Sequence, residues 1–148
     1  MKNLVTGGCG FIGSNLIDRL IKNGEFVVCL DDLTSGKLEN IKKFENNKKF
    51  KFINHDVISP LKSDQKIDKI WHLACPASPI HYQIDPLRTS KINFQGTLNI
   101  LEFAKENNAI FLLASSSEVY GNPRIHPQNE EYFGSVNPIG IRSCYDEG

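Results

Sequence analysis

Three glycines near the N-terminus carry the first sign of chemistry. Gly7, Gly10 and Gly13 are spaced GxxGxxG and follow a short apolar run that ends at Thr6. Apolar residues continue at helical spacing, so this stretch predicts a strand, a tight turn and a helix. Glycines let a backbone approach a pyrophosphate, and a helix N-terminus offers it unpaired N–H groups. We therefore expect a phosphate-binding turn, although any turn that needs positive φ would also use glycine.

Acidic side chains follow the next apolar runs. Asp31 lies 18 residues beyond the last of these glycines. There it can accept hydrogen bonds from an adenosine ribose and repel a 2′-phosphate, which favours NAD over NADP. Ser35 and Gly36 could contact the same ribose, and Asp56, next to Val57, could bind the adenine amino group. A solvated loop position for Asp31, and a capping or turn role for Asp56, are the alternatives.

Hydroxyl and carboxyl groups follow the last apolar run. Ser115, Ser116 and Ser117 could point into a cleft, or each could merely cap the strand end, and Glu118 is a candidate acid or base. Tyr145 follows 27 residues after Glu118. Because a phenol ionises at about pH 10, a tyrosine acts as a base near neutral pH only beside a cation. From the residues alone, Tyr145 would be an ordinary residue of an amphipathic helix.

The surrounding pattern predicts the elements that position these residues. Near-continuous apolar strands alternate with helices, which predicts an α/β fold: a Rossmann-like, doubly wound parallel sheet with right-handed crossovers. Ligands of such sheets bind at the carboxyl ends of the strands, where every polar cluster falls, including residues 75–79. Gly96 inside a long helix indicates close packing. The predicted strands end at residue 6 and cover 26–30, 50–54, 70–74 and 110–114; the predicted helices cover 11–23, 38–44 and 86–108 and begin again near 141, after an irregular loop at 121–140.

Composition limits the partners and the compartment. The chain has 148 residues, which suits one domain over residues 1–148, and 17 basic residues balance 17 acidic ones. Zero net charge argues against nucleic acid or an anionic membrane as partner. The four cysteines form no CxxC pair, so we expect free thiols and no metal site. Neither a membrane span nor a signal peptide is evident, which predicts a cytoplasmic protein.

Several longer motifs resemble those of one family. TGGCGFIG at residues 6–13, HLA at 72–74 and SSSEVYG at 115–121 resemble the extended short-chain dehydrogenase/reductase family of nucleotide-sugar enzymes. CPASPIHY at 75–82 and NPIGIRSCYDEG at 137–148 narrow the resemblance to its UDP-glucuronate decarboxylases. The resemblance covers essentially the whole chain. It implies NAD as cofactor and UDP-glucuronate as substrate.

The resemblance also implies roles for individual residues. The cofactor contacts that it implies are Gly7, Gly10, Phe11 and Ile12 at the pyrophosphate, Asp31, Ser35 and Gly36 at the adenosine ribose, Asp56 and Val57 at the adenine, and Leu73 and Ala114 beside the nicotinamide. Lys91 would bind near the cofactor ribose and the sugar nucleotide, although from sequence alone it is a surface lysine. Ser116 would bind a sugar hydroxyl, Glu118 would be a catalytic carboxylate, and Tyr145 would be the base.

The implied reaction begins when Tyr145 removes the proton of the sugar 4-hydroxyl while NAD takes the C4 hydride. The resulting 4-keto group acts as electron sink as the C5 carboxylate leaves as carbon dioxide, and the hydride then returns to C4. The family pattern places a lysine four residues after Tyr145, beyond Gly148, and its substrate-binding portion lies further on. We therefore expect the 148-residue chain to be an incomplete NAD-binding domain without decarboxylase activity of its own.

Three alternatives remain open at this level. Within the fold, the protein could be a 4,6-dehydratase or a 4-epimerase, against which residues 75–79 and 137–148 argue. It could instead be a non-catalytic dinucleotide-binding module, or a chain that does not fold alone. The resemblance further implies that the full-length enzyme is a homodimer, formed through the helix at 86–108 and the helix that carries Tyr145.

Overall fold

Five parallel strands form one sheet in the order β3-β2-β1-β4-β5. The computed structural model describes residues 1–63 and 65–148. The chain runs outward from β1 on one side and then crosses to the other, so the strand order reverses between β1 and β4. This arrangement confirms the predicted doubly wound parallel sheet, in which ligands bind at that reversal. The strands are β1 (Lys2–Thr6), β2 (Phe26–Asp31), β3 (Phe50–Asn54), β4 (Lys69–His72) and β5 (Ile110–Leu113).

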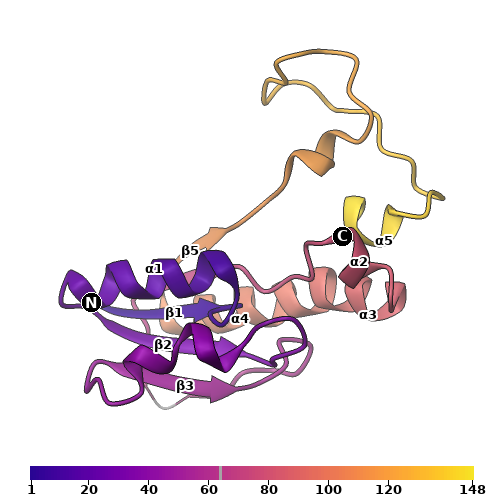
Figure 1. The fold of residues 1–148 in the computed structure, drawn as a ribbon. Coiled ribbons are helices and arrows are strands. Elements are labelled where there is room, and N and C mark those ends of the chain that lie inside the picture. Colours follow the sequence, from indigo (N-terminus) through magenta and orange to yellow (C-terminus); the bar gives the residue numbers. More distant parts are fainter. Residues whose placement is uncertain (64) are drawn as a thin grey trace.

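Helices cover both faces of this sheet (Figure 1). The helical elements are α1 (Phe11–Lys22), η1 (Leu38–Asn40), η2 (Lys42–Phe44), α2 (Pro79–Tyr82), α3 (Pro86–Lys91), η3 (Ile92–Gly96), α4 (Thr97–Asn107), η4 (Ser117–Tyr120) and α5 (Ser143–Asp146). Because successive side chains of a strand point to opposite faces, the strands supply two cores. The core on the α4 side contains Leu4, Val28, Leu30, Ile70, Ile100 and Phe103. The core on the α1 side contains Val5, Val27, Cys29, Ile17, Leu20 and Phe44.

The helix predicted over residues 86–108 is interrupted. α3 passes into a π turn, η3, before α4 begins, so the prediction of one regular helix is wrong at its centre. A π turn accommodates one extra residue per turn, which hydrophobic spacing alone does not reveal. Gly96 ends this turn, and a Cβ there would lie 2.7 Å from Val57 Cγ2, which confirms the predicted close packing.

Other differences are smaller. Residues 38–44 form two short 3₁₀ turns in place of one helix, and α2 was not predicted because its prolines suggested a loop. Pro79 instead occupies the first turn of α2, where a missing N–H costs nothing. Strands β4 and β5 end one or two residues earlier than predicted, and β2 includes Asp31. Such terminal differences are ordinary for element boundaries.

After β5 the chain leaves the sheet, and its last helix, α5, packs beside α2 and α3 (Figure 1). Between η4 and α5 the backbone is irregular, as predicted for residues 121–140, with one bridge between Gly121 and Ser135. The thiol of Cys144 in α5 donates to the carbonyl oxygen of Tyr82 at 3.7 Å. The polypeptide thus brings α5 against the elements that follow β4.

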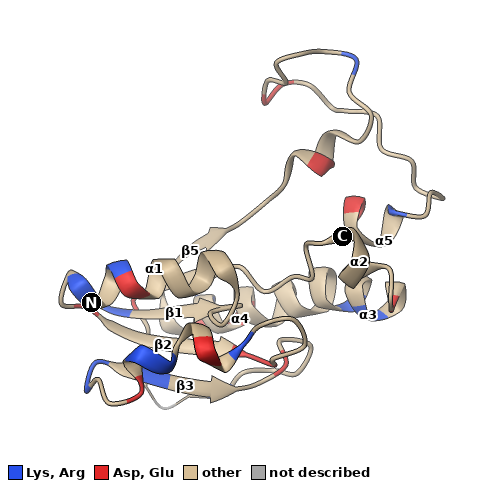
Figure 2. Cartoon of the chain, in the orientation of Figure 1, with Lys and Arg blue, Asp and Glu red and all other residues tan. Residues whose placement is uncertain are grey.

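Charged residues of both signs are interspersed along the elements (Figure 2). All four cysteines are free, and Cys9 and Cys29 are buried with their sulfur atoms 3.9 Å apart. Within residues 1–63 and 65–148, no three His, Cys, Asp or Glu side chains are grouped so as to hold a metal ion. In the same part of the chain, no helix is both long enough and apolar enough to cross a bilayer.

Candidate functional site

The glycine turn lies at the carboxyl end of β1 and requires glycine for two reasons. Gly7 has φ +67°, and a Cβ on it would lie 2.8 Å from the carbonyl oxygen of Leu73. Its own N–H donates to the Leu30 carbonyl at 2.8 Å, which ties the turn to β2. α1 begins directly afterwards, and among the described residues no side chain caps its N-terminus. The first-turn N–H groups of α1, including those of Phe11 and Ile12, therefore remain available for an anion.

Asp31 connects the glycine turn to the loop after β2. One carboxylate oxygen accepts from the Cys9 N–H at 2.9 Å, and the other accepts from the Leu33 N–H at 2.8 Å. The side chain is buried, and burial raises the pKa of the Asp31 carboxyl. A carboxylate has about four acceptor positions, so two remain for a ligand in the cleft.

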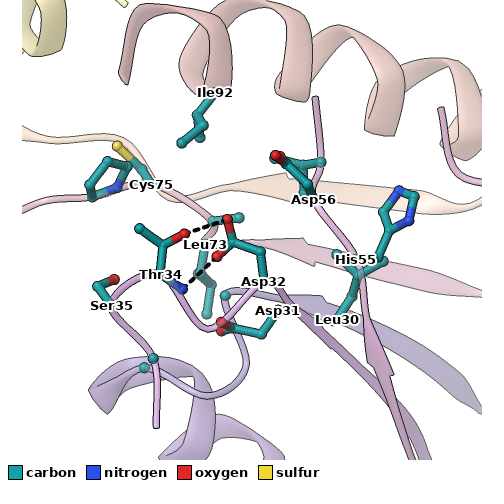
Figure 3. A pocket seen from close by; sticks show the side chains of 16 residues that line it. Leu30, Asp31, Asp32, Thr34, Ser35, His55, Asp56, Leu73, Cys75 and Ile92 are labelled. Carbon is teal, nitrogen blue, oxygen red and sulfur yellow. Dashed lines mark hydrogen bonds between the residues drawn. The ribbon is translucent and has the colours of Figure 1, made fainter. Parts of the chain in front are cut away.

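A cleft opens at the strand ends above this turn (Figure 3). Its wall includes most of the predicted cofactor contacts: Gly7, Gly10, Asp31, Ser35, Gly36, Asp56, Val57 and Leu73. The remaining four lie elsewhere. Phe11 and Ile12 expose their side chains at the start of α1. Ala114 lines a second pocket. Lys91 is exposed at the end of α3 and lines neither pocket. The individual binding roles stay predictions.

Arg88 is a neighbour of this cleft that the sequence analysis missed. Its guanidinium is paired with two of the strand-end carboxylates, those of Asp32 and Asp56. Partial burial acts to raise the pKa of Asp32, but hydrogen bonds from Thr34 and Arg88 outweigh it and lower that pKa. Asp56 also accepts from the N–H of Ile58 at 3.0 Å, so its side chain has the turn role that was the alternative to adenine binding. An arginine on a polar helix suggests a solvated side chain, so only the fold could reveal this contact.

The second pocket collects the predicted catalytic residues. Ser116 and Glu118, at the start of η4, and Tyr145, in α5, all line it. The Ser116 hydroxyl accepts from the Glu118 N–H at 3.2 Å, so this serine also caps the turn that follows the strand. Glu118 forms an ion pair with Arg142. The Tyr145 ring stacks on that of Tyr82, with centroids 4.8 Å apart and planes 10° from parallel.

A buried chain of hydrogen bonds joins the two pockets. The Thr6 hydroxyl accepts from the N–H groups of Leu73 at 3.1 Å and Ala74 at 3.2 Å, and it lies 2.8 Å from Nδ1 of His72. Both Thr6 lone pairs are thereby used, so its hydrogen is donated to Nδ1. The His72 Nε2–H then donates to the Thr97 hydroxyl at 3.1 Å. Leu73 and Ala74 line both pockets, which makes Thr6 and His72 part of the site.

A glycine turn and a strand-end acid at the reversal point of a doubly wound parallel sheet define a Rossmann-like α/β domain. Residues 4–148 match the family model described as GDP-mannose 4,6 dehydratase. The chain belongs to this family.

Individual relatives refine this assignment. The chain is 53% identical over its whole length to UDP-glucuronic acid decarboxylase 4 of Arabidopsis thaliana, covering 33% of that protein. It is 51% identical over 98% of its length to UDP-glucuronic acid decarboxylase 1 of Danio rerio, covering 34% of that protein. Among solved structures, UDP-glucose 4-epimerase from Thermus thermophilus in complex with NAD is 28% identical and superposes with a TM-score of 0.77, over 99% of this chain and 47% of the epimerase. The chain thus spans about a third of the decarboxylases that it matches.

Proposed function

We propose that this chain is the NAD-binding part of a UDP-glucuronate decarboxylase. The adjacency of two pockets carries the proposal: the first suits a dinucleotide, the second contains Ser116, Glu118 and Tyr145, and both share residues 73–75. The identity to decarboxylases of a plant and a vertebrate supports the substrate, UDP-glucuronate. The NAD in the similar epimerase structure supports the cofactor.

The residues of the first pocket fit NAD. The glycine turn has no room for a Cβ at Gly7, and the uncapped N-terminus of α1 suits a pyrophosphate. The Asp31 carboxylate is held in place by two backbone N–H groups and can accept from ribose hydroxyls. A 2′-phosphate next to this buried carboxylate would be repelled, which favours NAD over NADP.

The second pocket supplies groups for proton transfer. When bound, NAD supplies a hydride acceptor and donor for the sugar C4 position. Ser116 would orient the sugar 4-hydroxyl, and in the full-length enzyme Tyr145 would take its proton, with the family's lysine, four residues further on, as the cation that this requires. The stack with Tyr82 fixes the Tyr145 ring against α2, and the ion pair with Arg142 holds Glu118 at the pocket wall. Once C4 is a ketone, the bond between C5 and its carboxylate would break, because the ketone takes up the electron pair as carbon dioxide leaves. C5 would then take a proton, and return of the hydride to C4 would give the xylose unit.

Calorimetric titration of the chain with NAD, with NADP as control, tests the cofactor assignment. We expect saturable binding of NAD and much weaker binding of NADP. The polypeptide encoded by the whole reading frame should convert UDP-glucuronate into UDP-xylose and carbon dioxide, detected by chromatography of the nucleotide sugars. Formation of a 4-epimer of the substrate without loss of carbon dioxide would contradict the decarboxylase assignment and favour an epimerase.

We further propose that the full-length protein is a cytoplasmic homodimer. Exposed apolar side chains on α3, η3 and α4 support a dimer: Leu87, Phe94, Leu98 and Leu101. Free cysteines are typical of a reducing compartment. Light scattering on the full-length protein tests the dimer, and Phe94→Glu should shift its mass to that of a monomer.

A further inference from the structure

One guanidinium nitrogen of Arg88 joins two strand ends of the cleft. Nη2 donates to Asp32 Oδ2 at 2.7 Å and to Asp56 Oδ2 at 2.8 Å. Asp32 directly follows β2 and Asp56 follows β3, whereas Arg88 belongs to α3. Ile92, one helical turn after Arg88, lines the cleft, so this face of the helix points toward it (Figure 3).

The other oxygen of each carboxylate is held by the backbone. Asp56 Oδ1 accepts from the Ile58 N–H at 3.0 Å, and Asp32 Oδ1 accepts from the Thr34 N–H at 2.9 Å. Asp32 Oδ2 also accepts from the Thr34 hydroxyl at 2.7 Å, so Thr34 alone fixes both oxygens of Asp32. For Asp56, by contrast, Arg88 supplies the second fixed point. Among the described residues, no other cation pairs with either acid.

α3 does not need the Arg88 side chain to keep its place. Asp85 caps the helix by accepting from the backbone N–H of Arg88 at 2.9 Å. The buried Thr89 hydroxyl donates to the Tyr82 carbonyl at 3.0 Å. Neither bond involves the guanidinium, so its loss would free one oxygen of Asp56 while α3 keeps its cap and its contact with α2.

Arg88 offsets the negative charge that gathers at the edge of the cleft. Asp31, Asp32 and Asp56 all line the same cleft. Without Arg88, the Asp56 carboxylate would be repelled by Asp32, which Thr34 holds in place, and would turn away from it on its one remaining bond. With Arg88, Asp56 keeps one orientation and retains acceptor positions for a donor on the ligand.

We propose that Arg88 is a positioning residue for recognition of the adenine base, acting by fixing the Asp56 carboxylate as acceptor for the 6-amino group. The inference rests on the proposed function, because it takes NAD as the ligand of the cleft. Hypoxanthine carries an oxygen in place of that amino group, and a fixed carboxylate rejects it. Arg88 thus determines selectivity for adenine as well as affinity.

The test compares NAD with nicotinamide hypoxanthine dinucleotide, titrated by calorimetry into the 148-residue chain and its variants. The unmodified chain should prefer NAD. Arg88→Gln should weaken NAD binding by about tenfold, while binding of the hypoxanthine analogue changes little, so that the preference disappears. Arg88→Lys keeps a cation within reach of the acids and should restore most of the preference. Arg19→Gln, an exposed arginine on α1, is the matched control and should leave both affinities unchanged.

Thermal unfolding without ligand should be nearly the same for Arg88→Gln and the unmodified chain. Equal weakening of both dinucleotides in Arg88→Gln, or an unchanged preference, would overturn the role of Arg88 while leaving the NAD site intact. Failure of the unmodified chain to bind NAD would overturn the proposed cofactor and this inference together, so the two failures are distinguishable.

Discussion

Protonation of His72 should destabilise the fold at mildly acidic pH. The imidazole is 2% exposed, and burial lowers its pKa to about 4 from an ordinary value of 6.5. The hydrogen bonds act in the same direction, because Nδ1 accepts from Thr6 and has no room for a proton of its own. As the pH falls from 6.5 to 4, the unfolded chain binds a proton that the folded chain does not. The free energy of unfolding therefore decreases over this interval and is fully recovered above about pH 6.5.

The size of this effect follows from the two pKa values. Each pH unit between them is worth about 1.4 kcal/mol, so His72 contributes a loss of about 3 kcal/mol between neutral pH and pH 4. A domain of this kind is stable by only about 5–15 kcal/mol. The loss is therefore large enough to measure and small enough to leave the chain folded over most of the interval.

Urea unfolding of the chain and of His72→Asn at several pH values from about 4 to about 7.5 measures this contribution. Asparagine can accept from Thr6 without titrating, so the variant should be less stable at neutral pH and should depend less on pH. The difference between the two curves should narrow by about 3 kcal/mol toward pH 4. Parallel curves would refute the assignment, as would an NMR titration in which the His72 imidazole changes protonation near pH 6.5.

Three further substitutions test other contacts. Asp31→Asn should weaken NAD binding about tenfold, because the ribose loses a charged acceptor. It should also bring the affinity for NADP closer to that for NAD. Equal Kd values of the variant and the unmodified chain for NAD would contradict this prediction. Gly96→Ala should reduce the unfolding free energy by about 1–3 kcal/mol, since the new methyl group would meet Val57, and urea titration measures it. Tyr82→Phe should leave stability within about 1 kcal/mol or raise it, because the buried hydroxyl has no hydrogen-bond partner among the described residues; a larger loss of stability in the same titration would show that this hydroxyl has a partner.

Much of the fold could be predicted from the spacing of apolar residues. The strands were found because parallel strands buried on both faces form short continuous apolar runs, as in residues 26–30. The π turn at Ile92–Gly96 could not be predicted in this way, because it changes the hydrogen-bond pattern while the apolar spacing still resembles that of an α-helix. Gly96, the last residue of the turn, packs against Val57, and this contact joins residues far apart in sequence.

The site was predictable where residue type alone restricts the role. Glycine suits a turn that needs positive φ, and an acid at the carboxyl end of a parallel strand lies at the edge where ligands bind. The sequence predicts both features, and Gly7 and Asp31 line the cleft, although the alternatives for each could be weighed only with the fold in view. The roles of Arg88, Tyr82 and Thr6 could not be predicted from the sequence. Each acts through a partner distant in sequence, and an arginine, a tyrosine or a threonine fits many ordinary positions on a helix or strand.

The two pockets share one backbone segment. Leu73 and Ala74 lie between them, and the Thr6 hydroxyl holds both N–H groups. Gly7 follows Thr6, and a Cβ on Gly7 would lie 2.8 Å from the Leu73 carbonyl oxygen. The glycine turn and the wall of the second pocket therefore share their support at the end of β1. A proton on His72 would break the donation from Thr6, so we expect the event that lowers stability in acid also to loosen the backbone between the two pockets.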